Sequence, residues 1–204
     1  MGCAALNPLH WIDLRSRSRN EVLCRPGVRA TSEGRGYEVG FLNAWYHVDP
    51  VAERIRELSP LPGRKLSEEF QILLIRYLVA KNGGPLEGAT ISEKDLPGGS
   101  TFFQGPHTLH VAPLLEKFGR DPEAFVAVCT NMGGVSVPLG DKGVRFFPFP
   151  LIPVTYVLWQ EDEEFPASMT VLFDRSIGRW FELDMIFTLV LVVTERIMEA
   201  AQTC

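Results

Sequence analysis

Two histidines in a glycine–proline loop are the first residues of this chain that could bind a cofactor. His107 and His110 lie three residues apart in Gly105-Pro-His-Thr-Leu-His, after a long loop and before a predicted helix. Neutral imidazole can ligate the iron of a haem or the cobalt of a corrinoid, and Phe103 could form a wall of such a site. The spacing matches no specific metal motif. The alternative is therefore two ordinary loop histidines, with His107 making a structural hydrogen bond.

The acidic run Glu161-Asp-Glu-Glu164, which leads on to Asp174, is a second candidate. Carboxylates at a strand end can bind a divalent cation, or act as general acid and base where burial separates their pKa values. We expect Glu163, Glu164 and Asp174 to hold the ion, with the aromatic residues on either side of the run pressing Glu164 inward. The alternative is a solvated hairpin tip.

A glycine turn, Leu96-Pro-Gly-Gly99 followed by Ser100, is the third candidate, because its backbone N–H groups could cradle an anion. It lacks the strand, helix and lysine of a phosphate loop, so a tight turn is a sufficient explanation. No serine stands in a G-x-S-x-G elbow, and Cys129 falls within a predicted helix rather than at its electropositive start. An acyl-transfer triad is therefore not predicted.

The elements that position these residues are predicted from capping residues and hydrophobic spacing. Ser67 caps a helix that runs to about Lys81, with Gly83 beyond its end. Asp121-Pro-Glu starts a helix that ends at Gly133-Gly134. Further helices are expected at residues 8–14, 51–58, 111–118 and about 182–200, and strands at residues 37–49 (two strands around an Asn43-Ala44 turn), 89–92, 143–147, 154–160 and 168–173.

This order of elements favours an α+β fold with a mixed, mostly antiparallel sheet, a central helical segment and a C-terminal helix. Helices cluster in the middle of the chain and strands lie on both sides, rather than alternating one by one. We expect residues 1–26 to form an N-terminal helical extension and residues 27–204 a single α+β domain. The set Phe146, Phe147 and Phe149 is expected in the core.

Composition narrows the class of protein. The chain has 204 residues, of which 46% are hydrophobic and 22% charged, as in an ordinary globular domain. Its net charge of −5 provides no basic stripe for phosphates, so we expect no nucleic-acid partner. The most apolar stretch, residues 185–193, is far shorter than the roughly 20 residues needed to cross a bilayer, and we expect a core helix and no membrane span.

The four cysteines are scattered and have no C-x-x-C pair and no histidine at zinc-finger spacing. They are Cys3, Cys24, Cys129 and Cys204. A zinc site or an iron–sulfur cluster held by this chain alone is therefore not expected. Reduced thiols and the lack of an uninterrupted apolar leader segment favour a cytoplasmic protein.

A succession of segments along most of the chain carries a family resemblance. They are Tyr37-Glu-Val-Gly-Phe-Leu-Asn-Ala-Trp-Tyr-His-Val, Leu74-Ile-Arg-Tyr-Leu, Leu96-Pro-Gly-Gly, Phe103-Gln-Gly-Pro-His, Leu158-Trp-Gln-Glu-Asp-Glu-Glu-Phe and Leu172-Phe-Asp-Arg-Ser. Over roughly residues 27–197 the chain resembles the bacterial and archaeal domain family of unknown function numbered 3786.

The resemblance implies an anaerobic setting, since members occur largely in strict anaerobes. Some carry an N-terminal cysteine-cluster domain similar to that of corrinoid iron–sulfur methyl carriers. This chain departs from them, because only Cys3 and Cys24 precede Tyr37, too few for a four-cysteine cluster. The resemblance implies no catalytic residues.

Three functions from different classes follow. The first is an accessory module that binds a small-molecule cofactor, haem or corrinoid, through His107 or His110. The second is a small enzyme assisted by a divalent metal on the carboxylates of Glu161–Glu164 and Asp174. The third is a structural domain that binds a partner protein.

Overall fold

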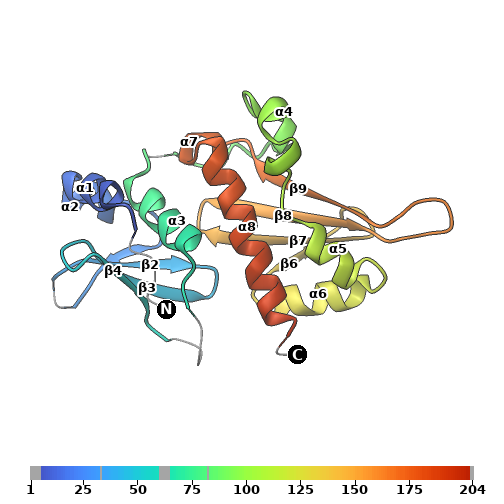
Figure 1. The fold of residues 1–204 in the computed structure, drawn as a ribbon, viewed down its shortest axis with the longest axis horizontal. Coiled ribbons are helices and arrows are strands. Elements are labelled where there is room, and N and C mark those ends of the chain that lie inside the picture. The colour runs from blue at the N-terminus through green and yellow to red at the C-terminus, as the bar shows by residue number, and fades with distance from the viewer. Residues whose placement is uncertain (1–5, 33, 60–64, 82, 203–204) are drawn as a thin grey trace.

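Two antiparallel sheets and a set of helices make up the chain (Figure 1). The structure, a computed structural model, describes residues 6–32, 34–59, 65–81 and 83–202. The α+β class is confirmed, and the strands divide between two sheets. Cys3 and Cys204 lie outside the described residues.

The helices match the longer predicted segments. They are α1 (Pro8–Ser16), α2 (Arg19–Leu23), α3 (Glu68–Val79), α4 (Gly99–Phe102), α5 (Ala112–Phe118), α6 (Pro122–Asn131), α7 (Ile177–Trp180) and α8 (Leu183–Ala200), with 3-10 turns η1 (Glu93–Asp95) and η2 (Gly105–His107). Ser67 and Asp121 cap α3 and α6 as predicted. The C-cap predicted at Gly83 is wrong, because α3 already ends at Val79 and its C-cap is Ala80. Among the described residues, no helix is both long enough and apolar enough to span a membrane.

The smaller sheet has the order β1-β2-β3-β4, with strands β1 (Val28–Ala30), β2 (Tyr37–Phe41), β3 (Ala44–Asp49) and β4 (Arg54–Glu57). The β2–β3 turn consists of Leu42 and Asn43, one residue earlier than predicted. Leu42 has a φ of 49° and its N–H donates to the Pro148 carbonyl (3.0 Å). The left-handed backbone at Leu42 thus occurs together with a hydrogen bond to a residue far away in sequence. The local sequence does not reveal that hydrogen bond.

The helix predicted at residues 51–58 is wrong, and strand β4 takes its place. Asp49 does not start a helix. Its carboxylate accepts the N–H groups of Val51 and Ala52 (both 2.9 Å) and closes a turn. The chain then runs back along β3, with Ile55 buried between two exposed arginines. This period of two is the pattern of a strand.

The larger sheet has the order β5-β9-β8-β7-β6 and every neighbouring pair is antiparallel. Its strands are β5 (Thr90–Ser92), β6 (Val135–Val137), β7 (Lys142–Phe149), β8 (Ile152–Trp159) and β9 (Ser168–Asp174). The hairpin tip between β8 and β9 extends beyond the rest of the sheet (Figure 1).

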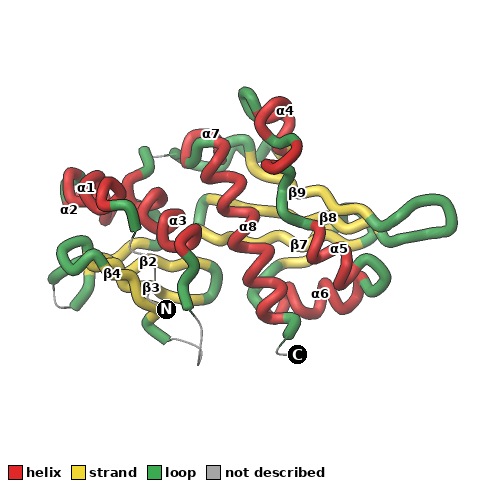
Figure 2. Tube along the Cα trace, in the orientation of Figure 1, coloured by secondary structure: helices red, strands yellow, loops and turns green. Residues whose placement is uncertain are grey.

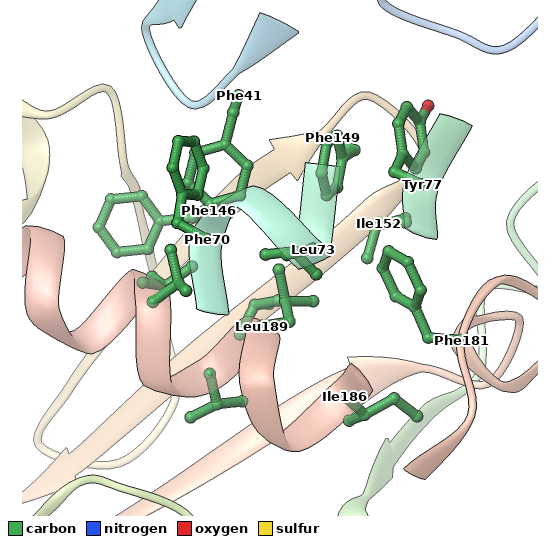
Figure 3. Packing of buried hydrophobic residues seen from close by; sticks show 14 of the residues in the cluster. Phe41, Phe70, Leu73, Tyr77, Phe146, Phe149, Ile152, Phe181, Ile186 and Leu189 are labelled. Atoms are coloured by element: carbon green, nitrogen blue, oxygen red, sulfur yellow. The ribbon is translucent and has the colours of Figure 1, made fainter. Parts of the chain in front are cut away.

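The long helix α8 crosses one face of the larger sheet (Figure 2). The Tyr156 hydroxyl on the central strand β8 donates to the Val190 carbonyl of α8 (3.2 Å) and lies 3.3 Å from the Thr194 hydroxyl. Helix α3 packs beside α8 and brings Phe70 and Leu73 into the same core (Figure 3). The helices therefore join the two sheets through one shared apolar layer.

Phe146 and Phe149 lie in this core as predicted, but Phe147 does not. Its side chain is 43% exposed. Phe146 points into the core, and successive side chains of a strand point to opposite faces, so Phe147 lies on the other face of β7. The register shift between Phe146 and Phe149 then returns Phe149 to the core. Val135 and Trp159 are also exposed.

Candidate functional site

A cleft of about 880 Å³ opens between the β2–β3 turn and the ends of helices α6 and α8. We call it the hairpin cleft. Its lining includes Phe41, Asn43, Trp45 and Tyr46 of the hairpin, Glu57 to Ser59 after β4, Asn131 and Met132 after α6, Arg196, Glu199 and Gln202 at the end of α8, and the cations Arg29 and Lys65. The volume lies within the range of small-molecule sites.

Hydrogen bonds hold the walls of the hairpin cleft in place. The Asn43 side-chain amide donates to the Met132 carbonyl (2.7 Å) and thereby ties the hairpin turn to the end of α6. The Leu58 N–H donates to the Trp45 carbonyl (2.8 Å) and continues the pairing of β3 with β4. The contact of Asn43 with Met132 joins residues 89 positions apart in sequence, so tertiary packing closes this side of the cleft.

Arg196 is the unusual side chain of the hairpin cleft. It is only 6% exposed, although arginine is rarely buried. Its guanidinium lies 4.8 Å from the centre of the Phe70 ring, and Nη1 donates to the Glu199 carboxylate (2.9 Å). A guanidinium has five N–H donors, and that bond is the one hydrogen bond it makes among the described residues. The remaining donors are available to an acceptor in the cleft.

A stacked pair forms another wall. The Arg29 guanidinium carbon lies 3.9 Å from the centre of the Trp45 ring, and Arg29 Nε donates to Glu38 (2.6 Å). Among its described lining residues, the hairpin cleft has the cationic side chains of Arg29, Lys65 and Arg196 and the carboxylates of Glu57 and Glu199. This small excess of positive charge among the described residues contrasts with the net charge of −5 of the whole chain.

A second cavity, of about 610 Å³, lies between strand β9 and the loop that precedes α5. We call it the edge groove. Met169 to Val171 of β9 line one side, and Phe103, Thr108 and Leu109 line the other. One carboxylate and one ammonium group, of Glu93 and Lys94, are the charged groups among its described lining residues.

A family model for a domain of unknown function, DUF3786, matches residues 20–196. The chain belongs to the DUF3786 family. Searches of curated proteins and of solved structures found no match.

The predicted cofactor residues of the DUF3786 chain do not converge on one cavity. The His107 ring stacks on Phe102 (ring centres 4.6 Å apart) and meets the edge of Phe187 (6.0 Å). His107 and His110 are both exposed, and neither lines the hairpin cleft or the edge groove. Phe103 is buried and lines the edge groove.

The predicted metal ligands lie at opposite ends of β9. Glu163 and Glu164 are exposed at the hairpin tip, so the predicted inward position of Glu164 is wrong. Asp174 follows the tip by the length of the strand, about 20 Å at roughly 3.3 Å per residue. Among the described residues, no three His, Cys, Asp or Glu side chains form a group that could hold a metal ion. A metal site on these carboxylates stays a prediction from the sequence.

The structure indicates a different role for Asp174, as an anchor for the chain before β5. Its carboxylate accepts N–H groups of Glu87 (2.9 Å), Gly88 (2.7 Å) and Ser176 (3.0 Å). Burial opposes its ionisation, but the hydrogen bonds from Ser176, Glu87 and Gly88 outweigh burial and lower its pKa. Cys129 is buried in α6, and burial raises its thiol pKa well above the usual range. Neither group is poised for proton transfer near neutral pH.

Backbone hydrogen bonds close the glycine turn at residues 96–99 and join it to α4. Gly99 N–H donates to the Leu96 carbonyl (2.8 Å), and Phe102 N–H donates to the Gly98 carbonyl (3.0 Å). The third candidate is thus a hydrogen-bonded turn at the start of α4, and anion binding there stays a prediction from the sequence.

We expect Gly99→Ala to lower the free energy of unfolding by about 1–3 kcal/mol, because a Cβ atom at this position would overlap the Glu93 carbonyl oxygen. Urea denaturation measures the change. Ser100→Ala, at the exposed next position, should change it by less than about 0.5 kcal/mol. Equal stabilities of Gly99→Ala and the wild type would show that the turn can open at no cost.

Arg196, the principal residue of the hairpin cleft, was not among the residues predicted from sequence. One signal was present. Arg196 follows Leu189 by seven residues and Val193 by three, so it falls on the buried stripe of α8. An arginine on an apolar helix face requires a polar partner. That requirement could have identified Arg196 as a candidate site residue from the sequence.

Proposed function

We propose that this protein is an accessory binding module that holds a small organic molecule with an acidic group in the hairpin cleft. The observation that carries the proposal is Arg196, a buried guanidinium with unused donors at a cavity of suitable size. Guanidinium groups bind carboxylates and phosphates through paired hydrogen bonds. Trp45 and Tyr46 provide apolar surface for the rest of the ligand.

A matched pair of fluorescent probes tests this proposal. 8-Anilinonaphthalene-1-sulfonate carries an anionic group, and N-phenyl-1-naphthylamine has the same ring system without it. We expect both to bind, and the sulfonate to bind about tenfold more tightly, as one added charged hydrogen bond allows. Fluorescence titration of the folded protein measures both affinities.

Arg196→Gln separates the role of Arg196 from that of the apolar walls. It should remove the preference for the sulfonate while the neutral probe still binds, and the melting temperature identifies any loss of folding. Arg145→Gln is the matched control, because Arg145 lies on β7 and donates to Thr155, away from the hairpin cleft. A preference that survives Arg196→Gln would mean that Arg196 stabilises the end of α8 rather than holding a ligand.

A second candidate function is the binding of haem or a corrinoid through His107 or His110. The ring contacts of the exposed His107 imidazole favour this function. Phe102 and Phe187 pack against the imidazole and hold it in one orientation. The test is an absorption spectrum of protein purified without oxygen and titrated with haemin and cobalamin. A band that is lost in His107→Ala or His110→Ala supports the candidate. A colourless protein with no spectral shift removes it.

A further inference from the structure

The larger sheet has a second face, opposite to the face that α8 crosses (Figure 2). Arg145 of β7 pairs with Thr155 of β8, and residues paired across strands direct their side chains to the same face. The Arg145 Nε–H donates to the Thr155 hydroxyl (3.0 Å), whereas the next residue, Tyr156, lies in the core. We call this second face the outer face. Along β8 it continues through Val157 to Trp159.

Large apolar side chains are exposed where the outer face reaches the β8–β9 hairpin. Trp159, the last residue of β8, is 41% exposed, and Phe165 in the hairpin tip is 67% exposed. Leu139, in the turn between β6 and β7, is exposed as well, and its neighbour Gly140 lies close to the Trp159 ring. Exposed apolar patches of this kind mark contact surfaces between proteins.

The outer face also has a charge pattern. Arg145 is the one charged side chain that β6, β7 and β8 direct onto it, and its N–H donors other than Nε have no hydrogen-bond partner among the described residues. In the hairpin tip, Glu161 pairs with Arg120 (3.1 Å). Glu163 and Glu164 are exposed there and form no ion pair within the described part of the chain. The tip therefore offers free carboxylates, and the middle of the face offers a guanidinium with free donors.

These opposite charges lie at matching distances on either side of Trp159. Thr155, which pairs with Arg145, precedes Trp159 by four residues, and Glu163 follows it by four. Each therefore lies about 13 Å from Trp159 at roughly 3.3 Å per residue. A two-fold axis beside Trp159 and perpendicular to the strands puts the tip of one copy over Arg145 of a second copy. The same rotation puts the second tip over the first arginine.

We propose that two copies of this chain associate through their outer faces about such an axis. The Trp159 side chains meet at the axis, and Phe165 of each tip packs on the outer face of the other copy. A second copy is the occupant that the charges favour, because the chain itself carries carboxylates at the distance that Arg145 requires. Phe147 lies farther along β7 than Arg145, outside this contact. None of the contact residues lines the hairpin cleft, so the proposal is independent of the proposed function.

Sedimentation equilibrium of the full chain over a range of concentrations measures the association. Arg145→Glu should weaken it at least about tenfold, because a carboxylate then faces the acidic tip. Glu163→Arg together with Glu164→Arg should weaken it similarly, and adding these two substitutions to Arg145→Glu should restore much of the wild-type affinity. Arg54→Glu is the matched control. It changes the net charge equally, but Arg54 is exposed on β4 of the smaller sheet, so the affinity should not change.

Phe165→Ser tests the apolar part of the contact. It should weaken the association and leave the melting temperature unchanged, because this side chain is exposed in one copy alone. The melting temperature of every variant identifies any loss of folding. A wild-type chain that stays monomeric at about 100 µM would overturn the proposal. So would a dimer that Arg145→Glu leaves intact, or one that the combined variant does not restore, since exchanging two charges rescues only a direct contact between them.

Discussion

Replacement of Phe149 by alanine should lower the free energy of unfolding by about 3–5 kcal/mol, the usual cost of emptying a buried aromatic site. The Phe149 side chain is fully buried. Its ring stacks on Tyr77 (ring centres 3.9 Å apart) and meets the edge of Phe41 (5.2 Å). The ring therefore joins β7 of the larger sheet to α3 and to β2 of the smaller sheet. Urea denaturation followed by circular dichroism measures the loss.

Phe147→Ala is the matched control, because it removes the same side chain two residues away on the same strand. Phe147 is 43% exposed, so we expect a much smaller loss, below about 1 kcal/mol. Similar losses for the two variants would mean that the face of β7 away from α8 is covered in solution. A small loss for Phe149→Ala would mean that the two sheets do not depend on this aromatic contact.

Replacement of Asp174 by alanine should lower the free energy of unfolding by about 3 kcal/mol at pH 7, because three backbone N–H groups lose a charged acceptor. The side chain is only 9% exposed, so water replaces these bonds poorly. Asp141→Ala is the control. Asp141 is exposed and accepts a single backbone N–H, that of Gln160, and its loss should be well under half as large.

The effect of Asp174→Ala should depend on pH. The folded state lowers the pKa of Asp174, so its stabilisation is complete above the ordinary aspartate pKa of about 3.9 and is lost as the pH falls through the lower, folded-state pKa. The gap in stability between wild type and variant should therefore be constant from pH 7 to about pH 5 and shrink below about pH 4. A gap that persists unchanged at pH 2.5 would show that the carboxylate charge is not what anchors the chain before β5.

Local sequence signals determined the longer helices of this protein and its fold class. Ser67 and Asp121 form helix starts wherever their segments lie, because a side-chain oxygen caps N–H groups only three residues away. The apolar spacing of residues 182–200 likewise predicted α8 and its buried face. These interactions join residues close together in the chain, so no knowledge of the fold is needed to predict them.

Tertiary structure alone decided where polar groups gather. Residues 51–58 became a turn and a strand because β3 offered a pairing edge, and Asp174 became an anchor because residues 87 and 88 pass beside it. The hairpin cleft brings Trp45 and Arg196 to one cavity from positions about 150 residues apart in the chain. Contacts at such separations depend on how helices and sheets pack. Local propensity carries no information about that packing, which is why the sequence pointed to the histidine loop and the acidic tip instead.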